Sequence, residues 1–305
     1  MARKWTRSHE AQMARILALM RVESKPFADS SPDAVAARKG KNFDDWCKTY
    51  FSHYFTSPSS LAHITADTLV EEQGIPIGLL WARGFGKTVR AILRRVRRIL
   101  QKESKFIIVG GRDEDIACDK MDMLRMELQL NPRLRQDYGE KIGPRAGANE
   151  DSDWIACDSR VWARGIGQSC RGALHGPRRP DDFLGDDLED DVLARSKERE
   201  QYLWDWLFSG VFPALEKGGN DAWFEVLLNK FPSRHCLAVK FRERAKEVDA
   251  NGRPICRFIE FPAETRSTTA QVSDSIFSQY IVPFEAVSVL LLAALIGAIV
   301  VARKE

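Results

Sequence analysis

The sequence predicts an α/β fold in which a mainly parallel sheet is flanked by helices. An apolar run, Ile75–Trp81, leads into a glycine-containing loop and then into a helical pattern. A second apolar run, Phe106–Gly111, precedes a long helical pattern over residues 113–137. Two later runs, Phe183–Leu184 and Asp221–Asn229, predict further buried strands. Strands that alternate with helices in this way favour a parallel sheet, because parallel neighbours need a crossover connection.

Three further features complete the predicted sheet and its helices. Trp154–Asp158 and Val161–Ala163 are spaced as the two strands of a hairpin, and Phe258–Pro262 is the last candidate strand. The long helical pattern is interrupted at Asn131-Pro132, because proline cannot continue a helix. We therefore expect two consecutive helices there.

Residues 1–70 predict an N-terminal helical segment. Ala11–Val22 has an amphipathic pattern, whereas Ser24–Gly40 contains serines, prolines and a glycine and predicts a loop or linker. In Asn42–Phe55, aromatic side chains recur at helical spacing. These rings could stack on a nucleotide base, but a packed helix face is the favoured interpretation.

Residues 82–88 read Ala-Arg-Gly-Phe-Gly-Lys-Thr and predict a phosphate-binding loop, or P-loop, between a strand and a helix. Gly84 and Gly86 permit a sharp turn that brings backbone N–H groups close to phosphate oxygens. Lys87 would reach the β- and γ-phosphates of ATP, and the Thr88 hydroxyl would hold Mg²⁺. The full P-loop pattern requires glycine where this chain has Trp81, so a basic surface turn is the alternative. The predicted nucleotide-binding residues are Gly84, Phe85, Gly86, Lys87 and Thr88.

The second motif is a pair of acids at the end of a short apolar run. Phe183-Leu184 is followed by Asp186-Asp187, as in a Walker B strand. Asp186 would hold the hydrated Mg²⁺, and Asp187 would polarise the attacking water. Asp182 and Gly185 are unusual in such a strand, so an acidic surface turn is the alternative. Asn229, at the end of a later apolar run, is the candidate that senses the γ-phosphate.

The amino-acid composition limits the possible classes of function but does not identify one. The net charge is 46 − 43 = +3, which is too small to indicate nucleic-acid binding by itself. Arginines are nevertheless crowded in one predicted helix. They could form a basic face that meets DNA or a neighbouring subunit of a ring. Ordinary solvent-exposed charge is the alternative, and it is the favoured interpretation for any single arginine. The six cysteines show no zinc spacing, so we expect reduced thiols and no structural metal. The helix in question carries Arg90, Arg94, Arg95, Arg97, Arg98 and Lys102.

Taken together, these stretches resemble the ATPase domain of the large terminase subunit of tailed bacteriophages, over residues of about 40–265. The segments that carry the resemblance follow the family's order: 50–55, 82–88, 131–139, 171–175, 179–181, 186–189 and 261–263. The resemblance implies a P-loop NTPase of the additional-strand type that hydrolyses ATP with Mg²⁺ and is coupled to movement of double-stranded DNA. It also implies catalytic roles for Asp187, Arg83 and Asp186, and a coupling role for Asn229. A homo-oligomeric ring, a phage portal, a small terminase subunit and a cytoplasmic location in the host are further implications.

The C-terminal region departs from that family. Residues 266–280 have the composition of a linker, and Ile281–Ala302 is almost entirely apolar and long enough for a bilayer. Residues 281–305 resemble the end of subunit J of respiratory complex I. We therefore divide the chain into 1–70, a P-loop ATPase domain at 71–265, the linker, and a C-terminal apolar helix at 281–305. No nuclease portion follows the ATPase residues, so nuclease activity is not expected.

Three interpretations of the apolar tail stay open: a fusion remnant, a membrane anchor and a buried core helix. The cations Arg303 and Lys304 follow the run, whereas residues 267–280 contain no lysine or arginine. The positive-inside tendency would then place the ATPase outside the cytoplasm, where ATP is absent, which argues against an anchor. The alternative function is a membrane-anchored or respiratory-complex-derived fusion protein without packaging activity, associated with the inner membrane through residues 281–302. A third hypothesis is an ATP-binding module that hydrolyses nothing.

Overall fold

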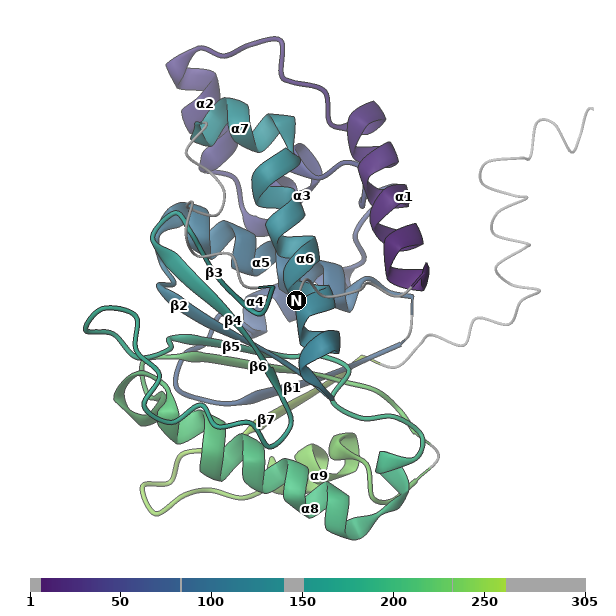
Figure 1. Cartoon of the computed structure of the whole chain (residues 1–305), viewed down its shortest axis with the longest axis vertical. Coiled ribbons are helices and arrows are strands. Elements are labelled where there is room, and N and C mark those ends of the chain that lie inside the picture. The colour runs from purple at the N-terminus through teal and green to yellow at the C-terminus, as the bar shows by residue number, and fades with distance from the viewer. Residues whose placement is uncertain (1–6, 83, 140–150, 232, 262–305) are drawn as a thin grey trace, which may run out of the picture. The chain divides into compact units, whose positions relative to one another are not determined.

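The computed structural model describes residues 7–82, 84–139, 151–231 and 233–261 and contains a seven-stranded sheet (Figure 1). The order across the sheet is β3-β4-β2-β5-β6-β1-β7. Only the hairpin of β3 and β4 is antiparallel, and the other neighbours run parallel. The strands are β1 (Ile77–Trp81), β2 (Phe106–Gly111), β3 (Asp153–Ala156), β4 (Ser159–Gly165), β5 (Asp182–Gly185), β6 (Trp223–Leu228) and β7 (Arg257–Phe261). The predicted mainly parallel α/β sheet is confirmed.

Most helices of the first half of the chain occupy segments in which the sequence showed helical spacing, whereas Lys197–Asp205 and Leu237–Arg244 are helices that the sequence analysis did not predict. Ser24–Gly40 was predicted as a loop but contains a short helix that starts at Pro32. Proline is favoured at the first position of a helix, and Ser31 caps this helix by accepting a hydrogen bond from Ala34 N. The interruption at Asn131-Pro132 separates two helices, as predicted. The helices are α1 (Arg7–Glu23), α2 (Pro32–Lys39), α3 (Phe43–Tyr50), α4 (Leu61–Leu69), α5 (Lys87–Gln101), α6 (Glu114–Leu130), α7 (Pro132–Tyr138), α8 (Lys197–Asp205) and α9 (Leu237–Arg244). A π-helix, Trp206–Val211, continues α8.

Two hydrophobic clusters lie on opposite faces of the sheet. The first contains buried side chains of α1, α3, α5, α6 and α7, and the second contains those of α8, the π-helix and α9. Figure 1 shows the same division, with the green helices α8 and α9 on one side of the strands. Most aromatic rings of residues 42–55 belong to the first cluster, because Trp46, Tyr50 and Phe51 are fully buried. The packed-face interpretation holds for these three.

Strand β6 lies between β1, which precedes the glycine loop, and β5, which precedes the paired acids. One strand thus separates the two strands that precede the sequence motifs. Gly185 pairs in register with Val226, and Leu80 pairs with Leu228. Since these strands are parallel, their carboxyl ends reach the same edge of the sheet. The loop, the acids and Asn229 therefore come from three neighbouring strand ends.

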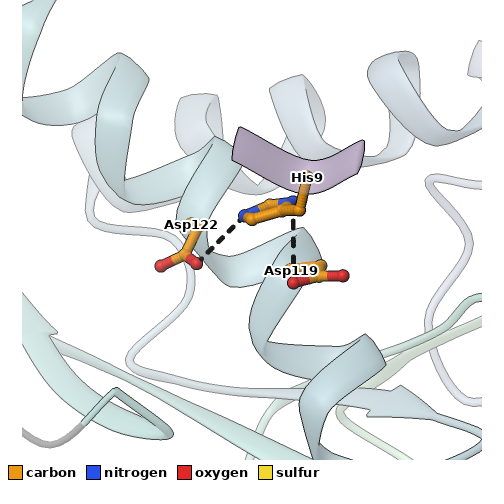
Figure 2. Close-up of side chains that lie close together, drawn as sticks. All are labelled: His9, Asp119 and Asp122. Atoms are coloured by element: carbon orange, nitrogen blue, oxygen red, sulfur yellow. Dashed lines mark hydrogen bonds and ion pairs between the residues drawn. The ribbon is translucent and has the colours of Figure 1, made fainter. Parts of the chain in front are cut away.

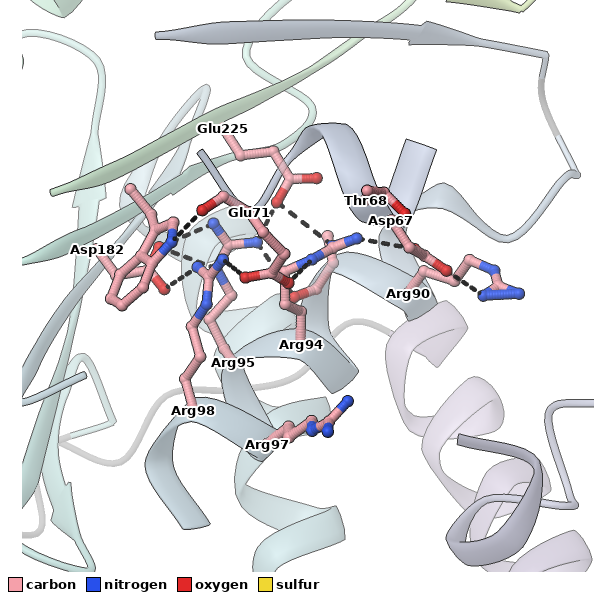
Figure 3. A network of polar contacts seen from close by, with 12 residues as sticks. Asp67, Thr68, Glu71, Arg90, Arg94, Arg95, Arg97, Arg98, Asp182 and Glu225 are labelled. Carbon is pink, nitrogen blue, oxygen red and sulfur yellow. Dashed lines mark hydrogen bonds and ion pairs between the residues drawn. The ribbon is translucent and has the colours of Figure 1, made fainter. Parts of the chain in front are cut away.

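The arginines of α5 are mostly buried between the helix and the sheet, so both sequence interpretations, a DNA face and solvated charge, are wrong for four of them. Arg90, Arg94, Arg95 and Arg98 are each at most 4% exposed. Figure 3 shows them directed at acidic side chains of α4, β5, β6 and the loop after α4. Buried acids on strands require cationic partners, which explains Asp182 within β5 and Glu225 within β6. Their acidic partners are Asp44, Asp67, Glu71, Asp182 and Glu225.

No helix in the described ranges is long and apolar enough to cross a bilayer. The linker at 266–280 and the apolar run at 281–305 lie outside those ranges. The predicted C-terminal helix, its membrane association and the domain boundaries after residue 261 therefore stay predictions.

Candidate active site

The glycine loop connects β1 directly to the N-terminus of α5. Gly84 and Gly86 have φ angles of 83° and 75°, in the left-handed region that side chains other than glycine rarely adopt. An added Cβ at either glycine would meet no atom within 4 Å, so the backbone conformation, and not crowding, requires glycine there. Helix α5 begins at Lys87 without a side-chain cap. No N-cap side chain therefore occupies the N–H groups of its first turn, which are the groups that an anion-binding loop uses.

The Lys87 ammonium lies at the end of β6. Its Nζ donates to the carbonyl oxygen of Leu228 and to Oδ1 of Asn229, both at 2.6 Å. Lys87 is only 9% exposed. The sequence predicted Lys87 and Asn229 as parts of one site, and the structure brings their side chains into direct contact.

Thr88 and Asp186 meet beside Lys87, at the end of β5. The Thr88 hydroxyl donates to Asp186 Oδ2 at 2.8 Å. Two ligands on neighbouring corners of a Mg²⁺ octahedron lie about 2.9 Å apart, given metal–oxygen distances of about 2.0–2.1 Å. The separation and the oxygen donors therefore fit Mg²⁺.

Asp187 has an unusual backbone for a residue other than glycine, with φ at 50°. Its N–H donates to Asp186 Oδ1 at 3.0 Å, and its carbonyl accepts from Arg112 N at 3.2 Å. Asn229 Nδ2 donates to Asp187 Oδ1 at 3.4 Å. Strained backbone of this kind is concentrated at functional sites. A chain of contacts thus runs from Lys87 through Asn229 to Asp187.

A second lysine, Lys120 of α6, completes the group. Its Nζ lies 2.7 Å from Asp187 Oδ2 and 3.4 Å from Asp186 Oδ2. The sequence did not single it out, because a lone lysine in a helix carries no local signal. It reaches the acids because β2, which leads into α6, pairs with β5.

The two acids differ in electrostatic environment. Burial raises the pKa of Asp186, which is 0% exposed, and the neighbouring Asp187 adds to the shift. Burial also acts on Asp187, but Lys120 and its hydrogen bond offset burial and hold the pKa of that carboxyl below its ordinary value. The surroundings therefore favour the charged form more strongly at Asp187 than at Asp186, which suits a group that orients water through its charge.

Two cavities flank these residues. One of about 290 Å³ is lined by Lys120, Asp187, Asn229, Arg112 and Asp190, among others. Another, of about 320 Å³, lies beside the glycine loop. Its aromatic lining is formed by Tyr54, Phe55, His63 and Phe85. The Phe85 ring is 46% exposed, and its carbonyl accepts from His63 Nε2 at 3.0 Å.

Arg83, predicted as a catalytic residue, lies outside the described residues. Its role stays a prediction. The other predicted positions (Gly84, Phe85, Gly86, Lys87, Thr88, Asp186, Asp187 and Asn229) all lie within the described residues, at the ends of β1, β5 and β6 or the start of α5. The chemical roles assigned to them also stay predictions.

Glu189, just beyond the paired acids, holds the N-terminus of α9. Both of its carboxyl oxygens accept from Leu237 N, at 2.8 and 2.9 Å. Burial raises the pKa of Glu189 to about 7, and the acids Glu200 and Asp190 add to the shift. The loop that carries Asp186 and Asp187 is thereby tied to α9.

We expect Glu189→Gln to remove a pH dependence of stability. The pKa of Glu189 in the folded protein, about 7, lies above the ordinary value of 4.5. The protonated side chain therefore contributes fully to the free energy of unfolding below pH 4.5, and this contribution is lost as the pH rises to about 7. The amide cannot ionise, so above that pH the variant should be more stable by at most about 3 kcal/mol. Thermal unfolding on both sides of this window measures the difference. The exposed Glu198→Gln is the control, and equal melting shifts for both variants would contradict the assignment.

His9 of α1 lies between two aspartates of α6 (Figure 2). Its Nδ1 is 3.5 Å from Asp119 Oδ1, and its Nε2 is 3.3 Å from Asp122 Oδ2. Each ring nitrogen thus faces a different carboxylate. The arrangement connects the N-terminal helix to α6, the helix that also carries Lys120.

Comparison with known proteins adds little to this site. No protein-family model matches the chain, and no curated protein matches its sequence. A solved structure described as the Phi-28 gp11 DNA packaging motor aligns with a TM-score of 0.37 and 11% sequence identity. The alignment covers 68% of this chain and 63% of that one, so the chain spans less than two thirds of that protein's length. A TM-score this low does not establish a common fold, so function has to be inferred from the site itself.

Proposed function

We propose that the chain binds Mg·ATP at the ends of β1, β5 and β6 and hydrolyses it. One observation carries the proposal: residues from three distant parts of the sequence meet in a single constellation. Thr88 contacts Asp186, and Lys87 contacts Asn229, which in turn contacts Asp187. An acidic surface turn or a basic surface turn would not require these side chains to converge.

The glycine loop and the neighbouring aromatic cavity define the proposed orientation of the nucleotide. The phosphates lie on the N–H groups of the glycine loop and the start of α5, where the helix dipole favours negative charge. Lys87 exchanges one of its acceptors, Leu228 O or Asn229 Oδ1, for a phosphate oxygen. The base enters the cavity of about 320 Å³, whose aromatic rings offer stacking surfaces. Tyr54 and Phe55 pack against the first hydrophobic cluster and also line this cavity.

Hydrolysis proceeds by in-line attack of water on the γ-phosphate. Thr88 and Asp186 would hold Mg²⁺, which would supply positive charge to the phosphate oxygens. Asp187 orients the water, and Lys87 stabilises charge on the transferred phosphoryl group. Asn229 contacts both Lys87 and Asp187, so it can couple the position of the lysine to that of the carboxylate.

We expect Asp187→Asn to retain Mg·ATP binding while turnover falls about 10²–10⁴-fold, because a carboxamide cannot take up a proton. Asparagine tolerates the left-handed backbone found at this position, so the loop should keep its shape. Binding of a fluorescent ATP analogue and steady-state phosphate release measure the two properties separately.

Asp190→Asn is the matched control, because Asp190 lines the same cavity but forms an ion pair with Arg112 at 2.7 Å. Its turnover should stay near wild type. Loss of binding and turnover together in Asp187→Asn would move the catalytic role to another acid, with Asp186 or Glu189 next. Wild-type protein that binds ATP and releases no phosphate would support the ATP-binding module instead.

We infer further that ATP hydrolysis drives the movement of double-stranded DNA, as in the large terminase subunits that the sequence motifs resemble. The support is that resemblance, which covers residues of about 40–265 and places a Walker-type loop and paired acids in the family's order. A homo-oligomeric ring that meets a portal and a small terminase subunit belongs to the same proposal. Stimulation of ATP hydrolysis by linear double-stranded DNA, but not by a polyanion of equal charge, distinguishes a DNA motor from an ATPase of another kind.

A further inference from the structure

Lys120 is placed by the fold, and not by its own sequence neighbourhood, against the two acids of the site. Asp186 N donates to Gly110 O at 3.0 Å, so the end of β2 is fixed beside Asp186. Helix α6 starts three residues after β2, capped by Asp113. This connection leaves the second turn of α6 over the acids, and the Lys120 side chain, 18% exposed, is directed at them.

The ammonium is not shared equally between the acids. It lies 2.7 Å from Asp187 Oδ2, within hydrogen-bond distance, and 3.4 Å from Asp186 Oδ2. Asp186 Oδ2 also accepts from Thr88, and these two oxygens are the proposed Mg²⁺ ligands. Lys120 therefore holds one acid directly and presents positive charge to the oxygen that would bind the metal.

We propose that Lys120 is a positioning residue that orients Asp187 for the attacking water and at the same time weakens Mg²⁺ binding beside Asp186. The inference rests on the ATPase function proposed above. Two consequences follow from the same side chain. Without the hydrogen bond, Asp187 can rotate away from the water, since it is 47% exposed and its other side-chain contact, with Asn229, is a long 3.4 Å. Without the positive charge, a divalent cation beside Asp186 meets less repulsion.

The test is Lys120→Met, which keeps the length of the side chain and removes its charge. We expect the turnover number for ATP to fall about tenfold to a hundredfold, because a displaced catalytic group costs this much. The Mg²⁺ concentration for half-maximal binding of fluorescent ADP should fall about tenfold, because a nearby cation has been removed. Lys120→Arg should restore most of the turnover and return the Mg²⁺ requirement toward wild type.

Opposite changes in turnover and Mg²⁺ affinity separate this role from a structural one, which would weaken both. Arg125→Met is the matched control, because it removes a cation from the same helix that bonds Asp122 at 2.9 Å and not the paired acids. Unchanged Mg²⁺ affinity in Lys120→Met, or weaker affinity, overturns the proposal. If Lys120→Met does not fold, Lys120→Gln and Lys120→Arg decide the matter by the same two measurements.

The two proposals fail in different ways. Wild-type protein that hydrolyses ATP, with Lys120→Met identical to it in both measurements, refutes the role of Lys120 alone. Wild-type protein that hydrolyses no ATP refutes the proposed function. In that case a titration with Mg²⁺ alone, followed by thermal shift, still shows whether Lys120 opposes the cation.

Discussion

Replacing Lys87 with alanine is expected to lower the rate of ATP hydrolysis by about 10²–10³-fold, the usual cost of losing one preorganised group that stabilises transition-state charge. Lys87 is the first residue of α5 and is 9% exposed, and its ammonium is bonded to Leu228 O and Asn229 Oδ1 at the end of β6. No other described lysine lies on the glycine loop. Steady-state phosphate release measures the loss, and binding of a fluorescent ATP analogue shows how much of it reflects affinity.

Lys87→Ala also removes the donor to Leu228 O and Asn229 Oδ1, so its fold needs its own measurement. We expect a small decrease in melting temperature, because each of these two acceptors loses one hydrogen-bond donor. The exposed Lys197→Ala serves as the control and should leave both activity and melting temperature unchanged. A Lys87→Ala protein that hydrolyses ATP at the wild-type rate would show that residues 82–88 are not a phosphate-binding loop.

The largest effect on stability is expected at Arg95. Its side chain is 0% exposed and bonds Asp182 of β5 at 2.8 Å, while its Nη1 bonds Glu225 of β6 (Figure 3). Burial opposes the charge of Arg95, but Asp182 and Glu225 more than offset it and raise the pKa of the guanidinium. Arg95→Met would leave both acids buried with fewer partners: Asp182 would keep Arg98 at 2.8 Å, and Glu225 would keep only the longer contact with Arg94 at 3.7 Å.

We expect Arg95→Met to lower the free energy of unfolding by about 3–5 kcal/mol, the usual cost of breaking a buried ion pair from one side. Arg97→Met is the matched control, two residues away on the same helix. Arg97 is only partly buried and bonds Gln101 and the carbonyl oxygen of Lys41, so its loss should cost at most about 1 kcal/mol. Urea denaturation of the two variants measures both values.

A rescue variant tests the cause. If the loss arises from uncompensated acids, adding Asp182→Asn and Glu225→Gln to Arg95→Met should recover much of the stability, because no buried charge is then left without a partner. Similar stability of Arg95→Met and Arg97→Met would mean that the buried pairs contribute nothing. The same three elements, α5, β5 and β6, also carry the candidate site, so ATP binding by the rescued protein would show whether the ionic contacts are needed to align it.

Much of the secondary structure could be predicted from the sequence because its signals are local. Phe106–Gly111 is an apolar run of strand length with glycines at its end, and it is β2 without a change of boundary. Asn131-Pro132 divides α6 from α7 because the ring of proline excludes helix continuation. The same local chemistry gives Ser31-Pro32 the ability to start a helix, and this was overlooked because prolines and serines also mark loops.

The sequence by itself determined the chemical groups of the site and their strands: a glycine loop before Lys87-Thr88, two acids after β5, and Asn229 after β6. Only the tertiary structure decided which of them touch, because strand order brings together residues more than a hundred positions apart. The tertiary structure also decided which charged side chains are buried and which are exposed. A periodicity cannot distinguish Arg95 from Arg97, since burial depends on whether an acid such as Asp182 or Glu225 lies opposite. The place of Lys120 in the site could not be predicted for the same reason, because Asp186 and Asp187 are distant from it in the sequence and adjacent only in the fold.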